Sequence, residues 1–312
     1  MALHMVMAMS TATPTIGLDE RSAAGARDFP AVRLLLKLAA VFGVLTVVTG
    51  SVNSATGSGF ACPTWPGCYP GHFGPEAEVH DIIEFGHRLI AASTGFILLG
   101  AAIAAFRLPR RFTMARVLPW FSVVGAILSA VLGRMVVLNG GIPMPLAVID
   151  LLGALTVLMA ATLAYMSMHR GAPRWQWTPL SRLAAGIMAS IVVLHLLGIV
   201  VSGKGSFTAV VGWPMWRLVS QDGAIWLQVL RMALAAGIVV SMALLTRRSW
   251  HLPTVRPVMI TMLALCAVEF VLGQVLAVEG VDMWWAAGHC AAACLMLLCI
   301  SVVSGRTALD GL

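Results

Sequence analysis

The chain has 312 residues, of which 59% are hydrophobic and only 11% are charged, and its formal net charge is +7 at pH 7. Such an apolar composition is typical of polytopic membrane proteins and excludes an ordinary water-soluble globular domain. The positive charge does not indicate nucleic-acid binding, because the basic residues alternate with apolar segments and have no base-stacking partners.

Apolar segments of membrane-spanning length recur eight times, most of them close to the ~20 residues that a helix needs to cross the hydrocarbon core. They cover roughly residues 31–52, 84–106, 115–138, 144–168, 183–202, 223–246, 256–278 and 283–304. The sequence therefore predicts an all-α polytopic membrane protein, with eight transmembrane helices arranged as two four-helix bundle repeats. A tail at 1–30 precedes an N-terminal half at 31–170 and a C-terminal half at 181–305.

Basic residues indicate the orientation of these helices. They gather in the N-terminal tail, in the loops after the second, fourth and sixth spans, and at the C-terminus. The opposite loops contain only Lys204 and Arg217. Because cytoplasmic loops carry an excess of lysine and arginine, we expect a multi-pass protein of a bacterial-type cytoplasmic (inner) membrane, with both termini in the cytoplasm.

The long loop after the first span contains two cysteines, Cys62 and Cys68, within the segment 59–68. An oxidising outer compartment permits a disulfide that closes this short loop. Two free thiols, or a reversible redox pair, are the alternatives.

The second span opens with Glu84-Phe85-Gly86-His87-Arg88. Glu84 and His87 are three residues apart, so they share one face of a helix. Ionisable residues inside a membrane segment are functional candidates, and a carboxylate near an imidazole fixes a metal-ligating tautomer. This pattern predicts His87 as a heme ligand and a functional Glu84. The alternative is a pair at the membrane interface that contacts water.

The eighth span contains His289, preceded by Trp284 and Trp285 and surrounded by small residues. Small neighbours would allow a flat macrocycle to approach the helix, and the tryptophans could line the ring. Interfacial tryptophan belts need no ligand, however. We predict His289 as a second heme ligand.

The two halves resemble each other, but each lacks one histidine of its sister. His87 aligns with Leu230 in the sixth span, and His289 aligns with Asp150 in the fourth. His195, in the fifth span, lies at a depth similar to that of His289. It could replace the histidine missing at Leu230, or it could be hydrogen-bonded within the bundle.

Asp150 could be a weak ligand, a proton relay or an ion-pair partner for Arg88 or Arg134. A strong low-spin heme ligand is usually His, Met, Cys or Tyr.

These residues resemble the heme A synthase family, eight-helix membrane enzymes that oxidise heme O. The resemblance covers nearly the whole chain after residue 35. It rests on Thr49-Gly50, the cysteine loop 59–68, Glu84-x-x-His87-Arg88 and His289. The family pattern has four axial histidines, on helices 2, 4, 6 and 8, and this chain matches the first and the last.

The resemblance implies a heme-dependent oxidoreductase that oxidises a heme O methyl group toward the formyl of heme A, for cytochrome oxidase biogenesis. In this interpretation His87, near Arg88, binds the substrate heme, and Glu84 is the catalytic residue that handles protons. Asp150 leaves the other face of the iron open. His289, alone or with His195, binds a cofactor heme b.

The alternative is a non-catalytic paralogue, a heme-carrying or heme-free integral subunit of a respiratory or photosynthetic complex. Expected partners are the heme substrate, a heme O synthase, cytochrome oxidase assembly factors or a larger membrane complex, and the sequence does not identify the electron donor. A transporter with inverted repeats is disfavoured, because the four-helix halves share one orientation.

Overall fold

In a computed structural model, residues 29–169, 174–202, 225–280 and 282–312 are described. The N-terminal tail up to residue 28, and Lys204 and Arg217 between the fifth and sixth spans, lie outside these ranges. The described residues form eight long helices and no strand. The helices are α3 (Pro30–Ala55), α4 (Val79–Phe106), α5 (Thr113–Asn139), α6 (Met144–His169), α7 (Pro179–Ser202), α8 (Ile225–Ser249), α9 (Arg256–Glu279) and α10 (Met283–Leu309).

All eight helices are long and apolar enough to cross a membrane, which confirms the predicted all-α polytopic membrane fold. The second helix begins at Val79, five residues before the predicted start. Glu84 and His87 therefore lie in the second and third turns of α4 and not at its end.

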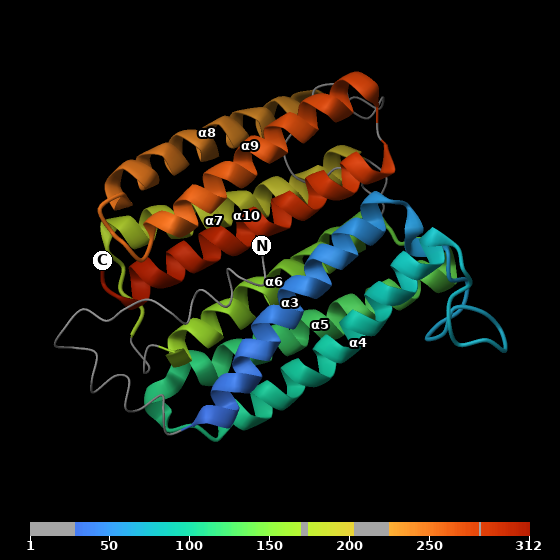
Figure 1. The fold of residues 1–312 in the computed structure, drawn as a ribbon, viewed down its shortest axis with the longest axis horizontal. Coiled ribbons are helices and arrows are strands. Elements are labelled where there is room, and N and C mark those ends of the chain that lie inside the picture. The colour runs from blue at the N-terminus through green and yellow to red at the C-terminus, as the bar shows by residue number, and fades with distance from the viewer. Residues whose placement is uncertain (1–28, 170–173, 203–224, 281) are drawn as a thin grey trace.

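The helices gather in two groups of four. Figure 1 shows the blue-to-green helices α3–α6 on one side and the yellow-to-red helices α7–α10 on the other, with nearly parallel axes. In the first group α3 contacts α4 and α6, and α5 contacts α4 and α6. In the second group α10 contacts α7 and α9, and α7 contacts α8. The groups meet where α10 lies against α3 and α6.

Small residues allow some of these helices to approach closely. A Cβ atom added to Gly125 of α5 would lie 2.6 Å from the carbonyl oxygen of Gly153 in α6. Because a side chain does not fit at that distance, the two glycines bring the backbones together, as small residues do in membrane bundles.

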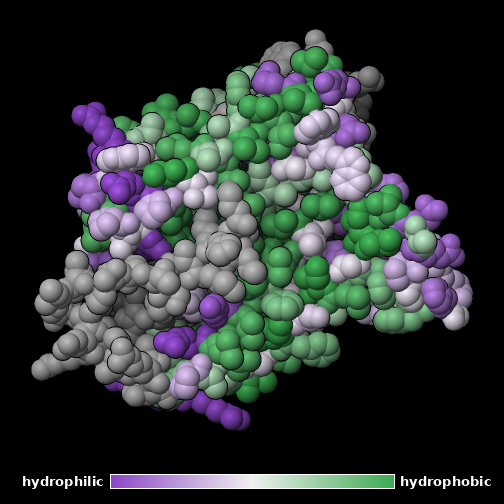
Figure 2. Space-filling view, viewed as in Figure 1, coloured by the Kyte–Doolittle hydropathy of each residue, from purple (hydrophilic) through white to green (hydrophobic). Residues whose placement is uncertain are grey.

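The outer surface of the helices is apolar. Phe96 of α4 is 79% exposed and Val124 of α5 is 63% exposed. Figure 2 shows mostly hydrophobic residues across the middle of the visible face, with hydrophilic residues toward the ends of the helices. Hydrocarbon is the environment in which such exposed apolar surface is stable, so this surface fits a multi-pass membrane protein.

Candidate functional site

The loop between α3 and α4 is folded over the start of α4. The structure brings Cys62 and Cys68 to disulfide-bonding distance, as the sequence predicts. The loop is also attached to α4 by Tyr69, whose hydroxyl donates to Asp81 Oδ2 over 2.5 Å. This hydrogen bond raises the pKa of Tyr69 to about 12, because the nearby carboxylate stabilises the protonated phenol.

Arg88 organises the backbone of the same loop. Its guanidinium donates to the carbonyl oxygens of Thr64 (2.6 Å), Gly67 (2.9 Å) and Cys62 (2.9 Å). It also pairs with Glu84, one turn earlier on α4. A planar guanidinium with several fixed donors is suited to such multiple binding. Arg88 is therefore a residue that positions the loop.

Glu84 completes this arrangement. The carboxylate is 2% exposed; Oε2 accepts from the backbone N–H of Cys62 at 2.7 Å, and Oε1 pairs with Arg88. Both oxygens are thus engaged in holding the cysteine loop. The proton-handling role expected for Glu84 stays a prediction, whereas its contacts define a structural role.

His87 lies against α3, where Thr49 and Gly50 shape its surroundings. The Thr49 hydroxyl lies 3.1 Å from His87 Nδ1 and donates its own hydrogen to the carbonyl oxygen of Leu45 at 2.8 Å. It can therefore only accept from Nδ1–H, which leaves the lone pair of the neutral imidazole on Nε2. Gly50 leaves room for the ring, because a Cβ atom there would lie 2.9 Å from His87 Cε1.

Asp150, on the second turn of α6, is half-buried. Its backbone carbonyl accepts from the Ser129 hydroxyl at 3.1 Å. It forms no ion pair with Arg88 or Arg134 within the described ranges. Arg88 is bound to the loop, and the Arg134 guanidinium lies 5.6 Å from the centroid of the Trp65 ring. The ion-pair alternative for Asp150 is therefore not what the structure forms.

In the second half, His289 faces a carboxylate that sequence reasoning missed. Its Nδ1 lies 2.6 Å from Oε2 of Glu269 on α9, although without the alignment of a hydrogen bond. His289 is fully buried, and Glu269 is 1% exposed. A carboxylate in the middle of an apolar helix is a functional candidate, and that signal could have identified Glu269. His289 Nε2 is buried without a hydrogen-bond partner among the described residues.

Burial distinguishes Leu230 from its neighbour Arg231 in α8. Leu230, which the sequence aligns with His87, is 49% exposed. Arg231 is 4% exposed, and its Nη1 donates to Gln228 Oε1 at 3.3 Å. Gln228-x-x-Arg231 thus repeats the spacing of Glu84-x-x-His87, and an arginine stands at the buried position.

His195, on α7, is 3% exposed. Its Nδ1 lies 2.6 Å from the carbonyl oxygen of Ile191, and a carbonyl only accepts, so Nδ1 carries the proton. The other ring nitrogen, Nε2, is buried without a partner in the described part of the chain. His195 lies within electrostatic range of Glu269, Arg231 and His289. One nitrogen is hydrogen-bonded within the bundle, while the other keeps a lone pair that could bind a metal.

The donor atoms fit an axial heme ligand in each half. Heme iron is commonly bound by a neutral imidazole whose other nitrogen donates to a polar group. His87 has this arrangement with Thr49, and His289 presents an unpartnered Nε2 beside Glu269. The described residues contain no group of three or more His, Cys, Asp or Glu side chains that could hold a bare metal ion.

The fold and the site thus define an eight-helix membrane protein with a ligand-type histidine in each half. No family model matches the chain. It is similar to a heme A synthase of Shouchella clausii, with 26% identity over 242 residues, which cover 74% of this chain and 80% of the relative. A heme A synthase of Bacillus pumilus is 29% identical over 140 residues, 43% of this chain and 45% of the relative.

A shorter stretch of 70 residues is 40% identical to a protoheme IX farnesyltransferase of Halobacterium salinarum, and it covers 22% of this chain and 15% of that protein. The chain is thus similar to several heme A synthases.

Proposed function

We propose that the chain is a heme A synthase-type oxidoreductase that oxidises a methyl group of heme O toward the formyl group of heme A. The observation that carries this proposal is the position of the proton on the His87 ring. Thr49 fixes its proton on Nδ1, so Nε2 presents a lone pair, and Gly50 leaves room for the imidazole ring against α3. Bound heme would supply the redox-active iron for the oxidation.

The residues of the first half would bind and enclose the substrate. His87 would hold the heme iron, whereas Asp150, a carboxylate, is a poor low-spin heme ligand. Glu84 and Arg88 hold the cysteine loop over the start of α4, close to His87. A closed loop at this position would limit the access of water to the reacting edge of the macrocycle.

In the second half, His289 would hold a cofactor heme b, with Glu269 beside its Nδ1 and with His195 as the second candidate ligand. The substrate would come from an enzyme that forms heme O, and the product would enter the assembly of cytochrome oxidase. We place the protein in a bacterial-type cytoplasmic membrane with both termini in the cytoplasm, because its basic loops lie on that side.

One observation favours a second candidate function, a non-catalytic paralogue in a larger membrane complex. Arg231 is buried on α8 within electrostatic range of His195, and an arginine does not ligate heme iron. If the second half holds no heme, the chain lacks the electron carrier that the enzyme interpretation requires.

Co-expression with a heme O synthase, in a host that lacks its own heme A synthase, tests the two candidates. Hemes extracted from the membranes are separated by chromatography. The enzyme interpretation predicts heme A or a hydroxylated heme O from the parent chain, and neither from His87→Ala. His251→Ala, which changes an exposed histidine, is the matched control. Unchanged heme O in cells that express the parent chain would support the paralogue.

A further inference from the structure

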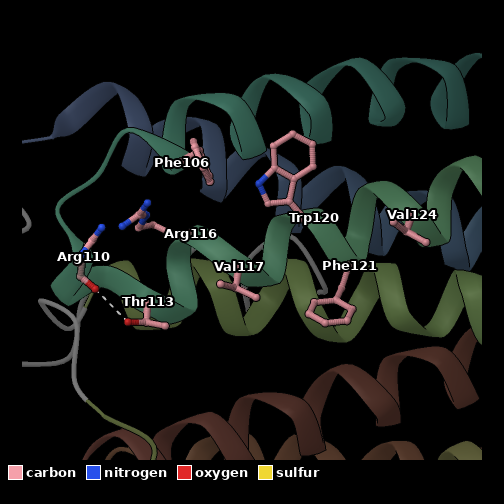
Figure 3. Close-up of a pocket in the computed structure, with 8 residues that line it drawn as sticks. All are labelled: Phe106, Arg110, Thr113, Arg116, Val117, Trp120, Phe121 and Val124. Carbon is pink, nitrogen blue, oxygen red and sulfur yellow. Dashed lines mark hydrogen bonds between the residues drawn. The ribbon is translucent and has the colours of Figure 1, made fainter.

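A groove lies at the basic ends of α4 and α5, away from the histidines. It has a volume of about 470 Å³ and is lined by Phe106, at the end of α4, and by one face of α5 from Thr113 to Val124. Figure 3 shows two arginines, Arg110 and Arg116, at one end of the groove and Val124 at the other. None of these residues belongs to the candidate heme site.

The mouth of the groove is strongly positive. The segment 107–116 contains four arginines and no acidic residue. The guanidinium of Arg116 lies over the Phe106 ring, 5.2 Å from its centroid, and this cation–π contact keeps the charge at the groove edge. Arg110 is exposed, and neither Arg110 nor Arg116 has a carboxylate partner in the described ranges of the chain. A ligand with a negative head group would complement this end.

The rest of the groove is apolar and follows the helix axis. Val117, Phe121 and Val124 are 46%, 56% and 63% exposed, and they are spaced three or four residues apart, on one face of α5. At 1.5 Å per residue, the face from Thr113 to Val124 extends about 16 Å, roughly half of the ~30 Å hydrocarbon core. The groove therefore runs from a charged end inward over the depth of one leaflet.

We propose that this groove binds an anionic phospholipid. The phosphate contacts Arg110 and Arg116, and one acyl chain lies along Val117, Phe121 and Val124. Guanidinium groups bind phosphate oxygens with charge-assisted hydrogen bonds, and basic pockets between transmembrane helices select anionic head groups. The groove is positively charged at one end and apolar along the rest of its length. A phospholipid would cover both parts, whereas a soluble phosphate compound would leave the apolar wall uncovered.

The test is a lipid titration of the purified full chain, followed by native mass spectrometry. Phosphatidylglycerol and phosphatidylcholine with the same acyl chains are the two probes. The parent chain should prefer phosphatidylglycerol. A basic residue near an anionic head group contributes about 1 kcal/mol, so Arg110→Gln with Arg116→Gln should weaken phosphatidylglycerol binding about 25-fold. The matched control, Arg247→Gln with Arg248→Gln, changes two exposed arginines at the basic end of α8 and should bind like the parent.

A second variant tests the apolar part without changing any charge. Val117→Trp fills the groove and should weaken binding of phosphatidylglycerol while the arginines remain. Equal affinity of the parent for the two lipids would overturn the proposal, as would an equal loss in the control variant or unchanged binding by Val117→Trp. Displacement of phosphatidylglycerol by heme O would also overturn it, because the groove would then be a path for the substrate.

Discussion

Gly50→Ala would move the imidazole of His87 without removing it. The added methyl group would lie 2.9 Å from His87 Cε1 and 3.4 Å from Nε2, the atom expected to bind iron. Carbon atoms prefer separations of about 3.5–4.0 Å, so the ring would have to shift by roughly 0.6–1.1 Å. Such a shift would also strain the 3.1 Å contact between Nδ1 and Thr49.

Overpacking of this kind costs about 1–3 kcal/mol. If that cost falls on the heme-bound state, heme affinity should drop by a factor of about 5 to 150. The assay is a heme titration of the purified protein followed by its absorption spectrum. Gly86→Ala is the matched control, because a Cβ atom at Gly86 would meet nothing within 4 Å. If Gly50→Ala and the control both bind heme as tightly as the parent, His87 is not the ligand.

Three further predictions concern the loop and α8. Alkylation under denaturing, non-reducing conditions should leave Cys62 and Cys68 unlabelled until a reductant is added, and complete labelling beforehand would exclude the disulfide. Arg231→His should create a low-spin heme signal in the second half, whereas Leu230→His should not, because Leu230 is exposed. The reverse result would support the pairing of Leu230 with His87 that the sequence predicts. The phenolate of Tyr69, defined by the difference from Tyr69→Phe, should appear near pH 12. The pKa of Tyr69 is raised in the folded chain, so its hydrogen bond to Asp81 contributes fully to folding stability below about pH 10. This contribution is lost as the pH rises toward 12. A phenolate already present at pH 10 would contradict this contact.

The hydrophobic length of each segment was sufficient to predict all eight helices, because a membrane imposes nearly the same requirement on every span. Hydropathy places the start of α4 too late, because Val79–Ile83 includes a histidine and an aspartate, which interrupt the apolar run but not the helix. Hydropathy marks where lipid begins, and a helix can extend beyond that point.

His87 and His289 can be predicted as candidate ligands from the sequence, but their neighbours in space cannot. The contact of Thr49 with His87 joins residues 38 positions apart and depends on how α3 packs on α4. The likeness of Leu-Arg-Met to His-Arg-Leu pairs Leu230 with His87, but it does not show that Leu230 is exposed and Arg231 buried. Glu269 belongs to no motif, and only its charge inside an apolar span distinguishes it.

We propose that His87 holds a heme for oxidation. The most direct measurement is pyridine hemochrome and heme-extraction analysis of the protein purified from cells that make heme O. We expect heme O or heme A bound to the parent chain, lost from His87→Ala and kept in His289→Ala. Heme b alone, or no heme at all, would contradict it.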